Sequence, residues 1–157
     1  MSISNIVSTI TPGSGLTLSG SDLIISPTYM GVASGTITSA QFKSILSPAF
    51  TVVPAVSGYT IIPTLMLLAG DYNTTQYADG SAVVFQYEST INASTEIPAS
   101  QFTSAFSEVS SATFELPHPN TNADLMDLPL KVTVVSADFT TGDSDVNYFV
   151  QYALVQF

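Results

Sequence analysis

The stretch LMLLAGDYNTTQYADGSAVVFQY (residues 65–87) places a polar loop between two apolar, strand-like runs. Asp79 and Gly80 form a strong turn signal directly before the second run. We interpret the loop as a long hairpin connection, and two other interpretations stay open. Tyr72 and Tyr77 could stack on a sugar while Asn73 hydrogen-bonds to it. The same side chains also suit contact with a protein partner.

Runs of β-branched and aromatic residues, separated by Gly, Pro and Asn, recur along the rest of the chain. Their spacing favours an all-β fold, with an antiparallel β-sandwich or jelly-roll-like body. No long segment has helical periodicity, which argues against α/β folds. Strands are predicted at residues 49–53, 58–68, 81–87, 112–116, 130–136 and 146–157, with less regular edge runs at 90–97 and 138–141.

Two of the predicted strands are apolar on both faces. Along residues 59–68 and 146–157, apolar side chains occupy odd and even positions alike. A strand of an antiparallel sandwich usually keeps one face in water. We therefore expect both faces of these strands to be covered, one of them by a neighbouring subunit.

One or two short helices complete the predicted body. In residues 38–46, Thr38 or Ser39 can cap a helix whose apolar side holds Phe42, Ile45 and Leu46. Residues 98–106 repeat the Q-F-x-S motif of this segment, which is a weak sign of internal duplication.

The N-terminal residues 1–34 differ from the rest, because short apolar pairs alternate with Gly, Ser and Pro. Each run is short for an independent strand. We predict an extended arm with one small hairpin around residues 19–21, followed by a β-sandwich domain at residues 35–157. The alternative is that this segment supplies an ordinary first strand pair of the main sheet.

Composition excludes several classes of function. The chain has 157 residues, twelve acids, two lysines and no arginine, for a net charge of −10. Nucleic acids and anionic membrane surfaces are therefore not expected partners, because both require basic patches. There is no cysteine for disulfides or thiol chemistry. No secretory signal or membrane-spanning run is apparent, and we expect a protein made in a cytoplasm.

Motifs for chemistry are weak. His118 is the only histidine, and its flanking prolines favour an exposed turn. Asp143, Asp145 and Asn147 match the start of a calcium loop, but the glycine and glutamate that such a loop requires later are absent. The carboxylates show no catalytic pairing in sequence. We expect no enzymatic activity, no cofactor and no metal.

Residues 37–157 share an order of motifs with one family. The chain opens this region with ITSAQF at residues 37–42, continues with VPA at 53–55 and an I-P pair at 62–63, and then has the YNTTQY hairpin at 72–77. It closes with Gly142, Asp143, Val146, Val150 and Tyr152. This layout resembles small virion proteins of tailed bacteriophages and prophages. The resemblance covers most of the body and none of the arm, and it transfers no functional residues.

The resemblance implies a β-sandwich structural protein without enzymatic activity, on the virion exterior. We expect a capsid decoration (cement) protein that forms a homotrimer and binds the major capsid protein. Its arm would lie across capsid subunits, with the contacts made by Ile6, Leu16, Leu18, Leu23, Ile24 and Ile25. The arm is also similar to short repeats of phage fibre proteins. The alternative is therefore a tail-fibre or receptor-binding module whose Tyr72, Asn73 and Tyr77 contact host glycan.

Overall fold

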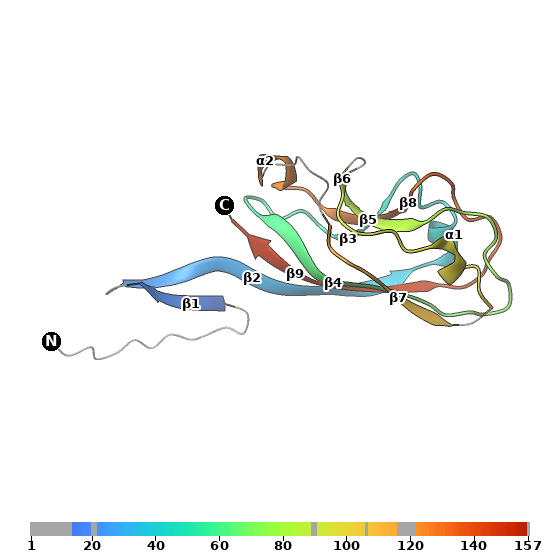
Figure 1. The fold of residues 1–157 in the computed structure, drawn as a ribbon, viewed down its shortest axis with the longest axis horizontal. Coiled ribbons are helices and arrows are strands. Elements are labelled where there is room, and N and C mark those ends of the chain that lie inside the picture. The colour runs from blue at the N-terminus through green and yellow to red at the C-terminus, as the bar shows by residue number, and fades with distance from the viewer. Residues whose placement is uncertain (1–13, 20–21, 89–90, 106, 116–121, 157) are drawn as a thin grey trace.

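The computed structural model describes residues 14–19, 22–88, 91–105, 107–115 and 122–156. Two antiparallel sheets form a sandwich, and an arm leaves it at the N-terminal side (Figure 1). The predicted all-β sandwich with an extended arm and short helices is confirmed. The elements are β1 (Ser14–Ser19), β2 (Asp22–Ile37), α1 (Ser39–Phe42), β3 (Phe50–Val53), β4 (Thr60–Gly70), β5 (Val83–Tyr87), β6 (Ile91–Asn92), η1 (Ala99–Gln101), β7 (Glu108–Ala112), α2 (Asn122–Leu125), β8 (Leu130–Val134) and β9 (Val146–Val155).

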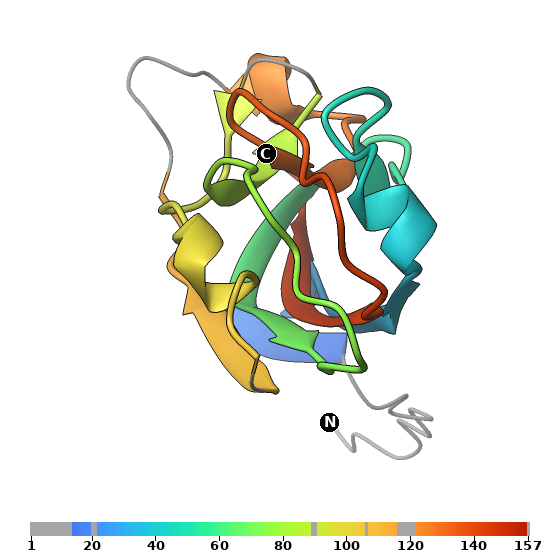
Figure 2. The same ribbon diagram turned by 90° about the vertical axis from the view of Figure 1, so that its right-hand side faces the viewer.

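The two sheets differ in size and in how the chain builds them. The larger has the strand order β1-β2-β9-β4-β7, and the smaller has the order β3-β8-β5-β6. β9, the last strand, lies between β2 and β4. The larger sheet therefore pairs the C-terminal strand with a strand from the N-terminal part of the chain. The smaller sheet covers one face of the larger sheet, and the hydrophobic core lies between them (Figures 1 and 2).

Glycines in β2 make room for aromatic rings on the inward face of the larger sheet. A Cβ at Gly31 would lie 2.5 Å from the ring of Tyr152, and a Cβ at Gly35 would lie 2.8 Å from the hydroxyl of Tyr148. Each glycine is the direct cross-strand partner of its tyrosine. The rings therefore pack on bare backbone, an arrangement that a side chain on β2 would block.

The helix predicted at residues 38–46 forms, but it is shorter. α1 begins after Thr38, whose side chain and backbone exchange hydrogen bonds with Gln41 in a capping box. Phe42 and Ile45 are buried, whereas Leu46 is 40% exposed. The Q-F motif that recurs at residues 101–102 also ends a short helical turn, η1. The Phe42 and Phe102 rings of the two motifs pack 5.1 Å apart.

The predicted strands 49–53, 58–68, 81–87, 130–136 and 146–157 correspond to β3, β4, β5, β8 and β9. The strand predicted at residues 112–116 was misplaced, because β7 ends where it was expected to begin. The Ser-rich β7 pairs with β4 at the edge of the larger sheet, whereas Phe114 makes only an isolated bridge to Ser94. The edge run 90–97 shortens to β6, and the run 138–141 makes only one bridge, between Phe139 and Asp79.

The arm is a two-stranded hairpin made of β1 and the first part of β2. It projects beyond the sandwich (Figure 1). β1 pairs with β2 alone, and the pairing of β2 with β9 begins only at Tyr29. The predicted boundary at residue 34 therefore falls inside β2, which belongs to the arm at one end and to the sandwich at the other. Ile6 lies outside the described residues.

Truncation should separate the two roles of β2. Deleting residues 1–28 removes the hairpin and leaves every β2–β9 register pair in place, so we expect a folded sandwich. Deleting residues 1–34 also strips β9 of its partners from Tyr29 to Ser34, and the midpoint of thermal unfolding should fall clearly below that of the shorter truncation. Circular dichroism against temperature measures both. Equal midpoints would show that residues 29–34 add nothing to the sandwich.

The strands predicted to be apolar on both faces are only partly covered within one chain. On the face of the larger sheet that points away from the core, Leu65 of β4 and Phe149 of β9 are each 37% exposed. Their inward neighbours Met66 and Val150 are buried. A single copy thus leaves an apolar sheet face open to solvent, and whether a neighbouring subunit covers it stays a prediction.

Candidate functional site

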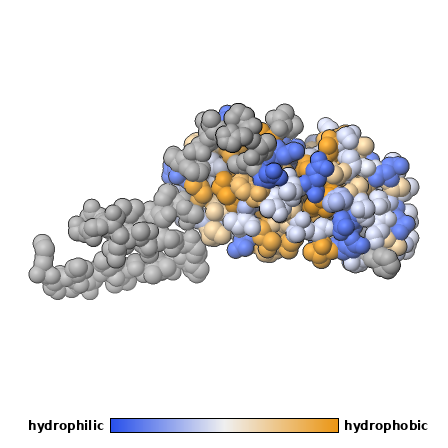
Figure 3. All heavy atoms as spheres, viewed as in Figure 1, coloured by the Kyte–Doolittle hydropathy of each residue, from blue (hydrophilic) through white to orange (hydrophobic). Residues whose placement is uncertain are grey.

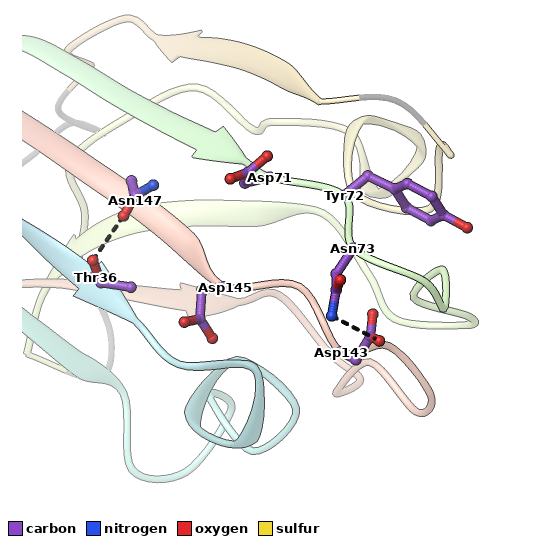
Figure 4. Close-up of a pocket in the computed structure, with 7 residues that line it drawn as sticks. All are labelled: Thr36, Asp71, Tyr72, Asn73, Asp143, Asp145 and Asn147. Atoms are coloured by element: carbon purple, nitrogen blue, oxygen red, sulfur yellow. Dashed lines mark hydrogen bonds between the residues drawn. The ribbon is translucent and has the colours of Figure 1, made fainter.

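The end of the sandwich opposite the arm is built from two loops that run side by side. Residues 71–82 connect β4 to β5, and residues 135–145 connect β8 to β9 (Figure 2). With the ends of β2 and β9 they surround a hollow of about 370 Å³. Its lining residues are Thr36, Asp71, Tyr72, Asn73, Asp143, Asp145 and Asn147 (Figure 4). The 72–77 loop therefore meets the G-D-S-D segment at residues 142–145, directly before β9.

Asp143 ties the two loops together. Its Oδ1 accepts hydrogen bonds from the backbone N–H groups of Thr75 (2.9 Å) and Thr74 (3.2 Å). Its Oδ2 accepts from the Thr74 hydroxyl and from Asn73 Nδ2 at 3.2 Å. The hydrogen bond from the Thr74 hydroxyl, followed by that from Thr75, lowers the pKa of this carboxyl. Both oxygens of the carboxylate therefore accept hydrogen bonds from the 72–77 loop and hold its conformation.

The other two carboxylates of the hollow also hold the backbone in place. Asp145 Oδ1 accepts from the Ser39 N–H at 2.8 Å, which anchors the start of α1 to β9. Asp71 Oδ1 accepts from the Ser107 hydroxyl at 3.0 Å. At the floor, the Thr36 hydroxyl donates to Asn147 Oδ1 at 2.7 Å across β2 and β9 (Figure 4). The acids of this hollow have structural partners on three different segments: the 72–77 loop, the start of α1 and Ser107.

Tyr72, Asn73 and Tyr77, the three loop residues singled out from the sequence, differ in burial. Tyr77 is buried against Phe42 and Phe139, and its hydroxyl donates to the Ser144 carbonyl. Burial, and then the charges of Asp145 and Asp143, raise the pKa of this phenol. Tyr77 therefore cannot reach a partner while the core stays closed.

Tyr72 and Asn73 remain at the surface of the hollow. The Tyr72 hydroxyl donates to the Thr74 carbonyl at 2.8 Å, which holds the ring against its own loop. The ring points away from the lining carboxylates in Figure 4. Of the three residues singled out from the sequence, only Tyr72 and Asn73 can therefore contact a partner at this hollow.

Metal binding can be checked in the described part of the chain. There, no group of three acidic or histidine side chains is placed to hold a metal ion. His118 lies outside the described residues, so its role stays untested. None of the described helices is long and apolar enough to cross a bilayer.

The role of Asp143 predicts a pH dependence of stability. Its pKa in the folded protein lies below the ordinary value of 3.8. Its contribution is therefore present above about pH 4 and is lost as the pH falls through the folded pKa. Asp143→Asn should lower the urea midpoint at pH 7, because the amide nitrogen cannot accept the loop hydrogen bonds. The gap from the wild type should shrink at pH 2 to 3, and a gap that persists there would contradict the assignment.

A second candidate surface is the outward face of the larger sheet, which we call the outer face. Register places its residues in four cross-strand rows: Met30, Ala153 and Ile62; Val32, Gln151 and Leu65; Ser34, Phe149, Leu67 and Ser111; Thr36, Asn147, Ala69 and Val109. Orange side chains gather along the lower margin of the body in Figure 3, where Figure 1 places this sheet. The exposed fractions are 59% for Val32 and 69% for Val109.

The sequence predicted the part of the outer face that belongs to β4 and β9, and it did not predict the part that belongs to β2 and β7. The contributions of β4 and β9 follow from their doubly apolar pattern. Met30 and Val32 were assigned to the arm, although their period-2 spacing with the small residues of β2 could have marked them as part of a sheet. Val109 was missed because β7 was expected later in the chain.

Comparisons with known proteins add one structural neighbour. No family model matches the chain, and no curated protein matches it. The fold is similar to a chain described as "Cyanophage Pam1 capsid asymmetric unit", with a TM-score of 0.49 and 14% sequence identity. The alignment covers 96% of this chain and 92% of the other. A likeness of this degree carries no argument about function.

Proposed function

We propose that the protein is a structural protein on the exterior of a tailed-bacteriophage virion and acts as a capsid decoration protein without enzymatic activity. The proposal rests on the resemblance of residues 37–157 to small phage virion proteins. The single structural observation that carries the proposal is the hairpin arm. This hairpin projects beyond the sandwich, and β1 pairs with β2 alone (Figure 1). A hairpin of two strands is marginally stable alone in water, so it needs a surface to lie on.

The apolar content of the arm suits such a surface. In the register of β1 and β2, Leu16 pairs with Ile25 and Leu18 pairs with Leu23. These four positions fall on one face of the hairpin, because direct partners and every second residue share a face. Ile24 pairs with Thr17 and falls on the other face. The proposed subunit contacts therefore centre on Leu16, Leu18, Leu23 and Ile25.

The two ends of the molecule suit an attached protein. The arm leaves one end, and the 72–77 loop and its hollow lie at the opposite end (Figures 1 and 2). We propose that the arm end faces the major capsid protein while the loop end faces outward, and that the decorating unit is a homotrimer. Many copies bound to one particle would add avidity to a modest single contact.

Co-sedimentation tests this proposal. The purified protein is mixed with shells assembled from the major capsid protein of the same phage, and the shells are pelleted. We expect the wild type to pellet with the shells and a Leu16→Thr, Leu18→Thr, Leu23→Thr variant to remain in the supernatant. A Val135→Thr variant, changed at an exposed position directly after β8, is the control and should pellet. A wild type that stays in solution would overturn the proposal.

A second candidate function is contact with a host glycan at the loop end. It is favoured by the hollow, where Tyr72 and Asn73 lie beside Asp71 and Asn147. Binding on a glycan array that is lost in Tyr72→Ala would support it, with Tyr59→Ala, changed outside this hollow, as the matched control. Equal binding by the wild type and Tyr72→Ala would exclude this hollow as the site.

A further inference from the structure

The hairpin and the outer face are two apolar surfaces on one chain. The hairpin places Leu16, Leu18, Leu23 and Ile25 on one face by register. The outer face exposes 47% of Met30 and 59% of Val32, beside the partly exposed Leu65 and Phe149. The outer face leaves these side chains exposed, and within the described residues β1 pairs with β2 alone. An exposed apolar sheet face of this kind is typical of protein contacts.

The distribution of charge on the chain favours an uncharged apolar partner for the outer face. The chain carries a net charge of −10, yet none of the described register positions of the outer face holds a charged residue. The described part of the hairpin has a single charge, Asp22, next to its turn. Two acidic molecules repel each other over most of their surfaces. The outer face is where another copy can approach, and an uncharged apolar ribbon matches it.

The geometry prevents a chain from covering its own outer face. β2 is continuous from Asp22 to Ile37, and seven of its residues precede the first pair with β9. At about 3.3 Å per residue these seven span roughly 20 Å. The strand carries the hairpin away from the body without a break (Figure 1). The hairpin that lies on an outer face must therefore come from a different molecule.

We propose that the β1–β2 hairpin of one copy packs across the outer face of a second copy. Each copy then donates one hairpin and accepts one, and such a contact closes into a ring when the rotation between copies allows it. A stable interface needs about 800 Å² from each partner. Four to five large apolar side chains at roughly 100 Å² each reach about half of this, and a ring supplies the contact twice per copy.

Association of the free protein is the first test. Sedimentation equilibrium of the wild type should show a closed oligomer of fixed size. Val32→Asp on the outer face should lower the association constant at least tenfold, and so should the pair Leu18→Thr, Leu23→Thr on the hairpin. Val135→Asp, at a valine that is 48% exposed and lies directly after β8, should leave it unchanged. A wild type that stays monomeric at 100 μM overturns the proposal.

A second measurement excludes direct packing of two outer faces. The chain has no cysteine, so Ser34→Cys on the outer face can carry a nitroxide alone. This copy is mixed with unmodified copies that carry labelled methyl groups, and broadening then reports contacts between molecules. We expect the hairpin methyls of Leu18 and Leu23 to broaden, and a nitroxide at Ser136→Cys to leave them sharp. Broadening confined to Val32 and Leu65 would overturn the exchange of arms.

These tests use the protein alone. One hairpin face cannot lie on a second copy and on a shell at once, so the arm exchange describes the protein free of the shell. The hairpin variants affect both proposals, whereas Val32→Asp changes the arm exchange alone. Failure to bind shells would overturn the proposed function and leave the arm exchange in place. A monomer that binds shells would do the reverse. The two proposals therefore stand or fall on different measurements.

Discussion

Phe42→Ala is expected to lower the free energy of unfolding by about 3–5 kcal/mol, the usual loss for a fully buried phenylalanine. Phe42 is 0% exposed. Its ring stacks on Phe139 at 5.0 Å and meets Tyr77 and Phe102 at 5.1 Å each. Removing it takes the central ring from a cluster that joins α1, η1 and both loops. The surrounding rings are held by separate segments and cannot all collapse into the space.

Urea unfolding followed by circular dichroism measures this loss. Phe42→Leu keeps most of the apolar volume and should lose less than Phe42→Ala, because the cavity is smaller. Leu46→Ala is the control at the end of the same segment: its side chain is 40% exposed, and we expect a change within about 1 kcal/mol. A Phe42→Ala variant as stable as Leu46→Ala would show that the aromatic cluster does not support the fold.

Gly142→Ala is expected to lower the free energy of unfolding by roughly 2–5 kcal/mol. Gly142 has a φ of +103°, and a Cβ there would lie 2.3 Å from the ring of Tyr77. About 1–2 kcal/mol of the loss comes from the backbone conformation and about 1–3 kcal/mol from the overlap with a ring in the core. The ring cannot move aside easily, because its hydroxyl donates to the Ser144 carbonyl and the ring packs edge-to-face with Phe42.

Two other glycines separate these causes. Gly58 has a φ of +80° and open space around the site of a Cβ, so Gly58→Ala should lose only the backbone part, about 1–2 kcal/mol. Gly70 has open space and an ordinary φ, so Gly70→Ala should be nearly neutral. If Gly142→Ala and Gly58→Ala lose the same amount, the contact with Tyr77 is not tight.

The strongest sequence signals were local, and they predicted local structure correctly. β-Branched and aromatic runs marked β4, β5, β8 and β9, because a pleated strand needs those side chains over a few consecutive residues. Thr38 and Ser39 were the two candidates for the cap of α1, and the cap is Thr38. The turn signal at Asp79 and Gly80 also holds: both have positive φ, of 55° and 75°.

The weaker predictions all depended on partners distant in sequence. Tyr77 looked like a loop residue because its neighbours are polar. It is a core residue because Phe42 and Phe139, 35 and 62 positions away, meet it at the end of the sandwich. β7 was displaced because a Ser-rich strand has little propensity of its own, and its place comes from pairing with β4.

For the candidate surfaces too, the local properties were predictable from the sequence, and those that depend on distant partners were not. Composition alone disfavoured nucleic acid and anionic membranes as partners, because net charge is a sum over residues and needs no coordinates. The pattern of β4 and β9 showed that both faces were apolar, but period-2 alternation cannot tell which face meets the second sheet. That choice comes from the register with β2, which spans more than a hundred residues of sequence. Long-range pairing therefore made one face the core and left the other, with Val32 and Phe149, open to a partner.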